Sequence, residues 1–255
     1  MNDEQLRNLF SSLAVLAQQG PIPVQAFSML VHNHSPEALA EQLHQRWLSD
    51  GRFAQIAATI IIHIHRFIRL DMMESPLTDS SGMALSSCTL GLLLNDYRNK
   101  EEVRNHSRLM FRNSVKAMFE MYRVYVEIDA CVSKCLVKPM LNCLEVLIDE
   151  NPDAEDVETM AILMTKNGSM LNELNSYFVD RLVVKIRAQL CSDEPFINAD
   201  IRRIFLHVID LWSFGWNELM IPESLTLNYT SHRDTAFLNK AKLEKKEFGS
   251  KESIV

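Results

Sequence analysis

The sequence predicts an all-α fold, a HEAT-like helical-hairpin solenoid of about eight to ten helices. Apolar residues recur every three or four positions along most of the chain, which places each set on one face of a helix. No segment shows the sustained apolar–polar alternation that a half-buried strand requires. Glycine and proline number only 7 and 8 in 255 residues, about half of average usage. The composition therefore disfavours many-hairpin β folds, because their tight turns need glycine.

The predicted helix starts follow from capping patterns. Ser35 and Asn151 each precede a proline and an acidic residue, so a side-chain oxygen caps free amides and an acid faces the positive end of the helix dipole. Asn99, with Glu102 three residues later, resembles a capping box. Asn198 is expected to cap a helix that begins at the next residue.

The predicted helix bodies are four apolar stripes, and the predicted stops are a few glycines and one proline. We expect helices to end at Gly20, Gly51 and Gly168, and a break at Pro139. The polar segment 74–82 is the one clear internal loop. The stripes are Phe53, Ile56, Ala57, Ile60, Ile61, Ile64 and Phe67; Phe111, Val115, Met118, Tyr122 and Val126; Leu171, Leu174, Phe178, Leu182, Ile186 and Leu190; and Ile201, Ile204, Phe205, Val208, Leu211 and Trp212.

The spacing of the helix starts favours a repeat architecture. Starts near Ser107, Pro152 and Asn198 are separated by 45 and 46 residues, within the ~40–47-residue period of HEAT-type hairpins. Stacked hairpins complete one another's cores, whereas the alternative is a compact bundle. We expect one helical-repeat domain over 1–221 and a polar, disordered C-terminal tail over 222–255.

Several kinds of active site are disfavoured. The closest glycines, Gly82 and Gly91, are nine residues apart, so no glycine-rich phosphate loop can form. The sequence has no Gly-x-Ser-x-Gly, His-Glu-x-x-His or Cys-x-x-Cys motif. Cys131 and Cys135 can share a helical face, but buried cysteines on an apolar face are the commoner case. We therefore expect that the protein is not an enzyme and that it has no catalytic residue, no cofactor and no bound metal.

The chain is expected to be cytoplasmic, with the nucleus as a second compartment. Its first residues show no signal peptide, and its most apolar stretch, 56–64, is too short to cross a membrane. Five cysteines without a secretory signal indicate a reducing compartment.

A basic segment is the most informative charge pattern. Seven basic and three acidic residues lie between Arg98 and Arg123, a net charge of +4 in a chain of −7. On a continuous helix a four-residue spacing gives one slowly winding ridge; a break around 105–107 would divide the ridge between two helices. Such a ridge can hold an acidic partner or phosphates, and an ordinary solvated helix face is the alternative. The five residues are Lys100, Arg104, Arg108, Arg112 and Lys116.

Two further patterns bear on partners. Seven acidic residues lie between Glu145 and Glu158, where helix-start preference explains part of the acidity. A basic ridge beside an acidic rim suits protein docking. The final Ser253-Ile254-Val255 fits a C-terminal ligand of PDZ type, although so short a pattern arises often by chance.

The order of segments over about 53–216 resembles a known family. The charged segment 98–108 follows an apolar run at 90–97, Leu-Gly-Leu-Leu-Leu-Asn-Asp-Tyr, and precedes the apolar helix 109–126. The region ends at 205–216 with Phe-Leu-His-Val-Ile-Asp-Leu-Trp-Ser-Phe-Gly-Trp. This order is similar to the middle domain of the translation initiation factor four-gamma family, above all to small single-domain members of the kind that binds the stem-loop-binding protein of histone mRNA.

The resemblance implies a right-handed stack of HEAT-like hairpins that binds proteins, and sometimes RNA, in mRNA translation or processing. The implied partners are a DEAD-box helicase, an mRNA-binding protein or a second copy of the chain. No membrane partner is expected, because the most apolar stretch, 56–64, is too short to cross one. We expect a non-enzymatic adaptor that links an mRNA-bound protein to translation factors or a DEAD-box helicase through the basic ridge. The alternative is direct RNA binding through the same ridge, 98–123.

Overall fold

The computed structural model describes residues 8, 12, 15, 35–74, 81–149, 151–195 and 197–226. Across these ranges the chain forms nine α-helices or shorter helical turns with defined bounds, α3 to α11, one 3-10 helix, η1, and no strand. The all-α prediction is therefore confirmed. No helix in this part of the chain is long and apolar enough to cross a membrane.

The chain divides into two compact units, Met1–Val146 and Leu147–Val255, which are described separately. The single helical-repeat domain predicted for 1–221, and its solenoid stacking, stay predictions. The predicted tail 222–255 lies outside the described residues after 226, while Glu223–Thr226 form the short helix α11. The predicted stop at Gly20, the interior of the loop 74–82 and the terminal Ser253-Ile254-Val255 also lie outside the described residues.

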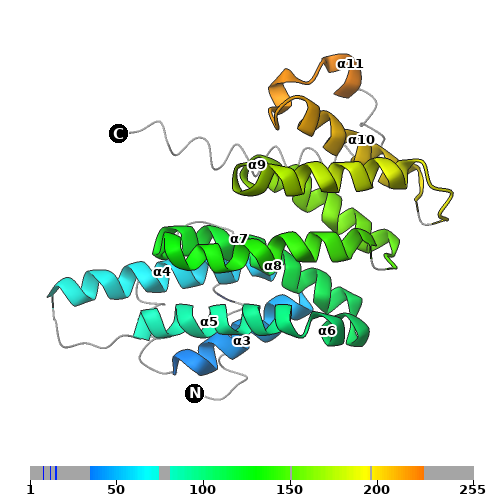
Figure 1. The fold of residues 1–255 in the computed structure, drawn as a ribbon. Coiled ribbons are helices and arrows are strands. Elements are labelled where there is room, and N and C mark those ends of the chain that lie inside the picture. Colours follow the sequence, from blue (N-terminus) through cyan, green and yellow to red (C-terminus); the bar gives the residue numbers. More distant parts are fainter. Residues whose placement is uncertain are drawn as a thin grey trace. The chain divides into compact units, whose positions relative to one another are not determined.

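In the first unit, α7 is the central helix. It packs against α3, α4, α5 and α6 (Figure 1), and more than half of its residues are buried. Its predicted stripe is confirmed from Phe111 to Tyr122, but its last predicted member, Val126, is exposed. Burial of Phe119 and Tyr125 extends the apolar surface round the helix, as a central position requires. The helices of this unit are α3 Pro36–Ser49, α4 Phe53–Glu74, α5 Ser81–Arg98, α6 Lys100–His106, α7 Arg108–Ile128 and α8 Ala130–Asp149, whose last residues belong to the second unit.

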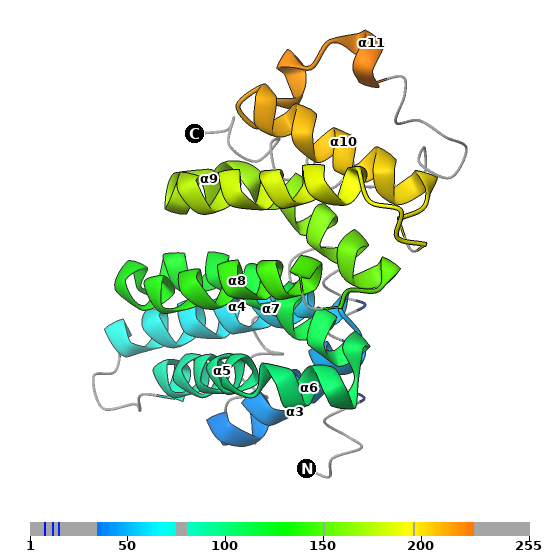
Figure 2. The ribbon, with the colours of Figure 1, turned by 45° about the vertical axis from the view of Figure 1, so that its right-hand side comes forward.

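In the second unit, α10 lies beside α9 (Figure 2). The α9 helix bends at Asn175, whose backbone is non-helical (φ −163°, ψ 85°) and whose Oδ1 accepts the N–H of Phe178 at 3.0 Å. Asn175 therefore caps the second segment of α9. The elements of this unit are α9 Ala154–Leu190, α10 Ala199–Ser213, η1 Glu218–Met220 and α11 Glu223–Thr226.

Two of the four predicted helix caps are confirmed. Ser35 Oγ accepts the N–H of Ala38 at 3.2 Å, and Asn198 Oδ1 accepts that of Ile201 at 2.9 Å. The cap predicted at Asn151 is wrong, because Asn151 has a φ of 47° and lies before the helix.

Asp153 caps α9 instead of Asn151. Its Oδ1 accepts the N–H of Asp156 at 2.7 Å, and Asp156 Oδ2 accepts the N–H of Asp153 at 3.4 Å, so the two residues form a capping box. The capping box predicted at Asn99 is also wrong. Asn99 makes no side-chain cap bond, and its Nδ2 donates to Asn95 Oδ1 at 3.2 Å.

Only one of the predicted stops that can be described is confirmed. Gly51 lies between α3 and α4, but α9 continues through Gly168 and α8 through Pro139. The break predicted at Pro139 fails because Leu136 and Met140 are both fully buried, so one apolar face holds the helix on either side of the proline. Gly168 does not end α9 but lies under the ring of Trp216.

Candidate functional site

The five residues of the predicted basic ridge lie on two helices. Lys100 and Arg104 belong to α6, whereas Arg108, Arg112 and Lys116 belong to α7. Ser107 separates the helices with an extended backbone (φ −158°, ψ 114°) and caps α7, because its Oγ accepts the N–H of Met110 at 3.3 Å. The ridge is therefore divided, which is the second of the two arrangements that the sequence allows.

Burial changes the interpretation of this ridge. Arg104 and Arg112 are only 9% and 6% exposed, and Lys100, Arg108 and Lys116 are half-buried. Arg104 places its guanidinium 6.0 Å from the centre of the Phe111 ring, and its long side chain contributes to packing. The five residues therefore do not form an open, solvated row of cations. Their role in binding a partner stays a prediction.

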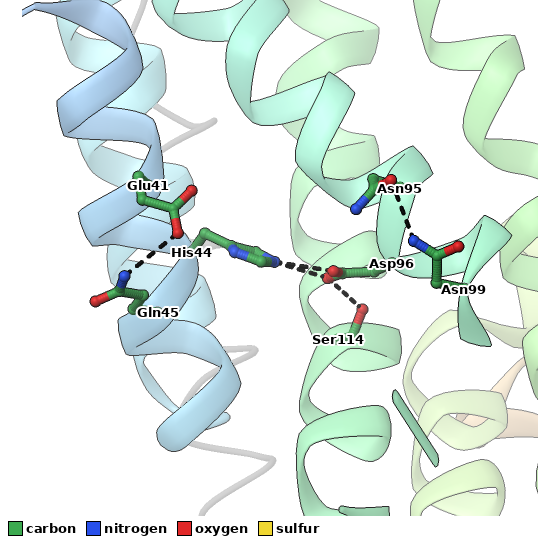
Figure 3. Close-up of polar contacts among 7 residues, drawn as sticks. All are labelled: Glu41, His44, Gln45, Asn95, Asp96, Asn99 and Ser114. Atoms are coloured by element: carbon green, nitrogen blue, oxygen red, sulfur yellow. Dashed lines mark hydrogen bonds and ion pairs between the residues drawn. The ribbon is translucent and has the colours of Figure 1, made fainter. Parts of the chain in front are cut away.

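Next to the ridge, three helices share a buried polar cluster that the sequence analysis missed. Asp96 of α5 contacts side chains from two other helices (Figure 3). Nε2 of His44, in α3, lies 2.9 and 3.0 Å from its two carboxylate oxygens. Oγ of Ser114, in α7, donates to its Oδ2 at 2.9 Å. Asp96 is 6% exposed. The residues are 52 and 18 positions apart, so no local motif announces them.

The cluster has the residue types of a hydrolase triad but the wrong order. In a triad the histidine stands between serine and carboxylate, so that it can take the serine proton. Here the carboxylate stands between the other two, and Ser114 donates to Asp96 rather than to His44. The imidazole of His44 therefore makes no hydrogen bond to Ser114, and the three side chains hold α3, α5 and α7 together.

A second buried contact joins α5 to α7. Tyr125 Oη donates to the carbonyl oxygen of Ser86 at 2.6 Å and lies 2.8 Å from Thr89 Oγ1. Burial raises the pKa of the Tyr125 phenol well above its usual value, so the group keeps its proton and remains a donor at physiological pH. These contacts stabilise the packing of α7 against α5.

In the second unit, apolar side chains are exposed along the second segment of α9. Tyr177 and Val184 are 72% and 65% exposed and, seven residues apart, lie on one face of the helix with Arg181 between them. We call Tyr177, Arg181 and Val184 the α9 surface. The predicted stripe that contains Phe178 and Leu182 is buried, and Tyr177 and Val184 lie on the opposite side of the helix, which the pattern of core residues does not single out.

The side of α9 that faces α10 is fixed by polar and cation–π contacts. Trp212 Nε1 donates to Asp180 Oδ1 at 2.9 Å, and the guanidinium of Arg187 lies 5.3 Å from the centre of the Trp212 ring. These contacts hold α10 against α9, so the α9 surface is presented on a packed helix rather than on a loose loop.

Much of the predicted acidic rim has a structural role. Asp153 and Asp156 form the capping box of α9, and Asp156 is fully buried. Asp149 forms an ion pair with Lys185. The acidity between Glu145 and Glu158 is therefore explained in part by helix starts and packing, as the sequence analysis allowed.

The cysteines differ from the expectation of burial. Cys131 and Cys135 are exposed on α8, whereas Cys143, two turns farther along, is fully buried. Burial raises the pKa of the Cys143 thiol to about 12. Within the described residues, no group of three or more histidine, cysteine and acidic side chains is placed to hold a metal ion.

Comparison of the chain with protein-family models and with curated proteins finds no match. The likeness to the middle domain of the initiation factor four-gamma family therefore stays a prediction from the sequence.

Proposed function

We propose that the chain is a non-enzymatic adaptor that binds a protein partner in mRNA translation or processing. The observation that supports docking most directly is the α9 surface. Large apolar side chains exposed together on a rigid helix are typical of protein contact sites, especially where an aromatic residue and an arginine are neighbours. Tyr177, Arg181 and Val184 combine these features on one helical face.

Fewer residues of the basic ridge are available to bind a partner than the sequence indicates. Arg104 and Arg112 are buried, so their main effect is on the stability of α6 and α7. Lys100, Arg108 and Lys116 retain exposed area and supply the positive charge that an acidic partner surface would meet.

The link to mRNA rests on the sequence resemblance alone. On that basis the partner is an mRNA-bound protein, and the chain connects it to translation factors or a DEAD-box helicase in the cytoplasm or nucleus. The alternative is direct RNA binding through the segment 98–123, and an RNA-binding measurement on the same proteins distinguishes it from protein docking.

The test compares two surfaces by quantitative affinity capture from cell extract. Tyr177→Asp with Val184→Asp should deplete specifically captured proteins at least tenfold, because two desolvated apolar contacts are replaced by charges. Val126→Asp, an exposed apolar residue of α7 in the first unit, is the matched control and should leave capture unchanged. Equal capture by all three proteins would contradict docking through the α9 surface.

RNA binding is measured on the same purified proteins. Wild-type protein should bind RNA weakly. Tight binding with a steep salt dependence, lost in Lys100→Glu with Arg108→Glu, would favour the RNA alternative instead. These two positions are chosen because they are half-buried, so their reversal perturbs packing less than substitution of Arg104 or Arg112.

A further inference from the structure

Two exposed thiols lie one helical turn apart at the start of α8. Cys131 and Cys135 are both exposed, and their i, i+4 spacing places them on one face of the helix. The turn that carries them is held in place by Asp129, whose Oδ1 accepts the N–H of Cys131 at 2.7 Å and that of Val132 at 3.3 Å.

The spacing of these thiols excludes a relaxed disulfide. Side chains at i and i+4 of a helix have Cβ atoms about 5–6 Å apart, whereas a disulfide requires about 3.5–4.5 Å. An intrahelical bond between Cys131 and Cys135 would therefore distort α8. The pair is better suited to binding one atom between the two sulfurs.

The number of ligands selects the kind of atom. Structural zinc takes four ligands, and no group of three candidate ligands is found in the part of the chain that the structure describes. Thiolate is a soft ligand that suits Cu(I), zinc and iron–sulfur clusters alike. Of these, a Cu(I) ion is satisfied by two thiolates. Among the described residues the two cysteines have no third ligand beside them, and a pair of thiols fits Cu(I) rather than zinc.

We propose that Cys131 and Cys135 form a two-coordinate site for Cu(I). Binding converts Cu⁺ and two thiols into a copper bis-thiolate of charge −1 with the release of two protons, and copper is neither oxidised nor reduced. Lys134 and Lys138 are exposed and, three residues beyond each cysteine, lie on the same helical face. Their positive charges oppose the charge that the complex gains. The site is independent of the proposed docking function.

The test is a competition for Cu(I) under anaerobic, reducing conditions with the full chain. Cu(I) is supplied as its coloured complex with bathocuproine disulfonate, and the protein should withdraw one Cu(I) per chain. Cys131→Ser and Cys135→Ser should each abolish this withdrawal. Cys191→Ser, which removes another exposed thiol, should retain it. Circular dichroism checks that each variant is folded, and serine at these exposed positions leaves no cavity.

Three results would overturn the proposal. The first is wild-type protein that leaves the coloured complex unchanged. The second is a single-cysteine variant that binds as the wild type does. The third is one Cu(I) per two chains, which would assign the metal to a bridge between copies rather than to the pair within α8. Loss of withdrawal in Lys134→Glu with Lys138→Glu at limiting copper, with the cysteines intact, would support the charge argument.

Discussion

The indole ring of Trp216 lies directly on the backbone of Gly168. A Cβ atom added at Gly168 would be 2.6 Å from Cδ2 of the ring and closer still to Cε3 and Cζ3. Trp216 reaches this position because α10 ends in a Schellman motif. Gly215 has a φ of 63°, its N–H donates to the carbonyl of Trp212 at 3.1 Å, and the N–H of Trp216 donates to the carbonyl of Leu211 at 2.6 Å.

This contact predicts that Gly168→Ala destabilises the protein although alanine favours helices. Overpacking costs about 1–3 kcal/mol, while replacing a helical glycine by alanine returns up to about 1 kcal/mol. We expect a net loss of about 1–2 kcal/mol in the free energy of unfolding, measured by urea titration. Adding Trp216→Leu should reduce the effect of Gly168→Ala.

The matched control is Gly91→Ala, in the interior of α5, where an added Cβ meets no atom within 4 Å. This change should stabilise the protein by about 0.5–1 kcal/mol. The same shift in both variants, in either direction, would contradict the role assigned to the Trp216 contact.

The buried cluster predicts a large effect at Asp96. Asp96→Ala leaves Ser114 Oγ and His44 Nε2 without their acceptor, and each buried unsatisfied group costs about 1–3 kcal/mol. We expect a loss of about 2–4 kcal/mol in the free energy of unfolding. Glu127→Ala removes the exposed ion pair with Arg66 in the same unit and should change it by less than about 1 kcal/mol. Similar values for the two variants would show that the cluster is not a stabilising contact.

Two asparagines that look alike in sequence should differ when replaced. Asn198 caps α10 through a 2.9 Å bond, so Asn198→Ala should cost about 1 kcal/mol. Asn99 makes no cap bond, and Asn99→Ala should cost less than about 0.5 kcal/mol, because it removes only an exposed contact with Asn95. Thermal unfolding of both variants checks the order, and a larger loss at Asn99 would reverse the assignment.

Stability should fall as pH rises through the alkaline range. Burial raises the pKa of Cys143 from its usual 9.0 to about 12. Above pH 9 the unfolded chain therefore loses the Cys143 proton while the folded chain keeps it, so the free energy of unfolding decreases with pH until about pH 12. The raised pKa of Tyr125 acts in the same direction at higher pH.

The readout for this effect is the slope of stability against pH, not stability itself. Cys143→Ala should make the decline between pH 9 and pH 10 less steep, even where loss of the side chain lowers stability at every pH. Cys131→Ser, at an exposed thiol, should leave the slope unchanged. An identical slope in wild type and Cys143→Ala would contradict the effect of burial on this thiol.

The features that the sequence predicts well are those set by near neighbours along the chain. The caps at Ser35 and Asn198 depend on bonds to residues three positions away, and the stripe from Phe111 to Tyr122 depends on helical periodicity. All are confirmed. Local patterns predict Asn151 rather than Asp153 as the N-cap of α9. Both side chains can cap a helix and they are only two residues apart, so the folded backbone determines which one does.

The features that local reasoning misses depend on contacts between distant residues. Gly168 resembles a helix stop until Trp216, 48 positions later, lies upon it. Arg104 and Arg112 look like solvated charges because a four-residue spacing says nothing about which other helices cover that face. The sharing of Asp96 between His44 and Ser114 has no sequence signal at all, since three separate helices must be placed first.

The sharing of one carboxylate by three helices also bears on how the first unit opens. Neither α3 nor α7 can separate from α5 without leaving Asp96 short of a partner in a buried setting. Opening of α3 or α7 therefore breaks one bond to a buried carboxylate, and opening of α5 breaks both. Backbone amides of the three helices should for this reason exchange with solvent deuterium as one cooperative unit. Asp96 thereby determines which segments of the first unit open together.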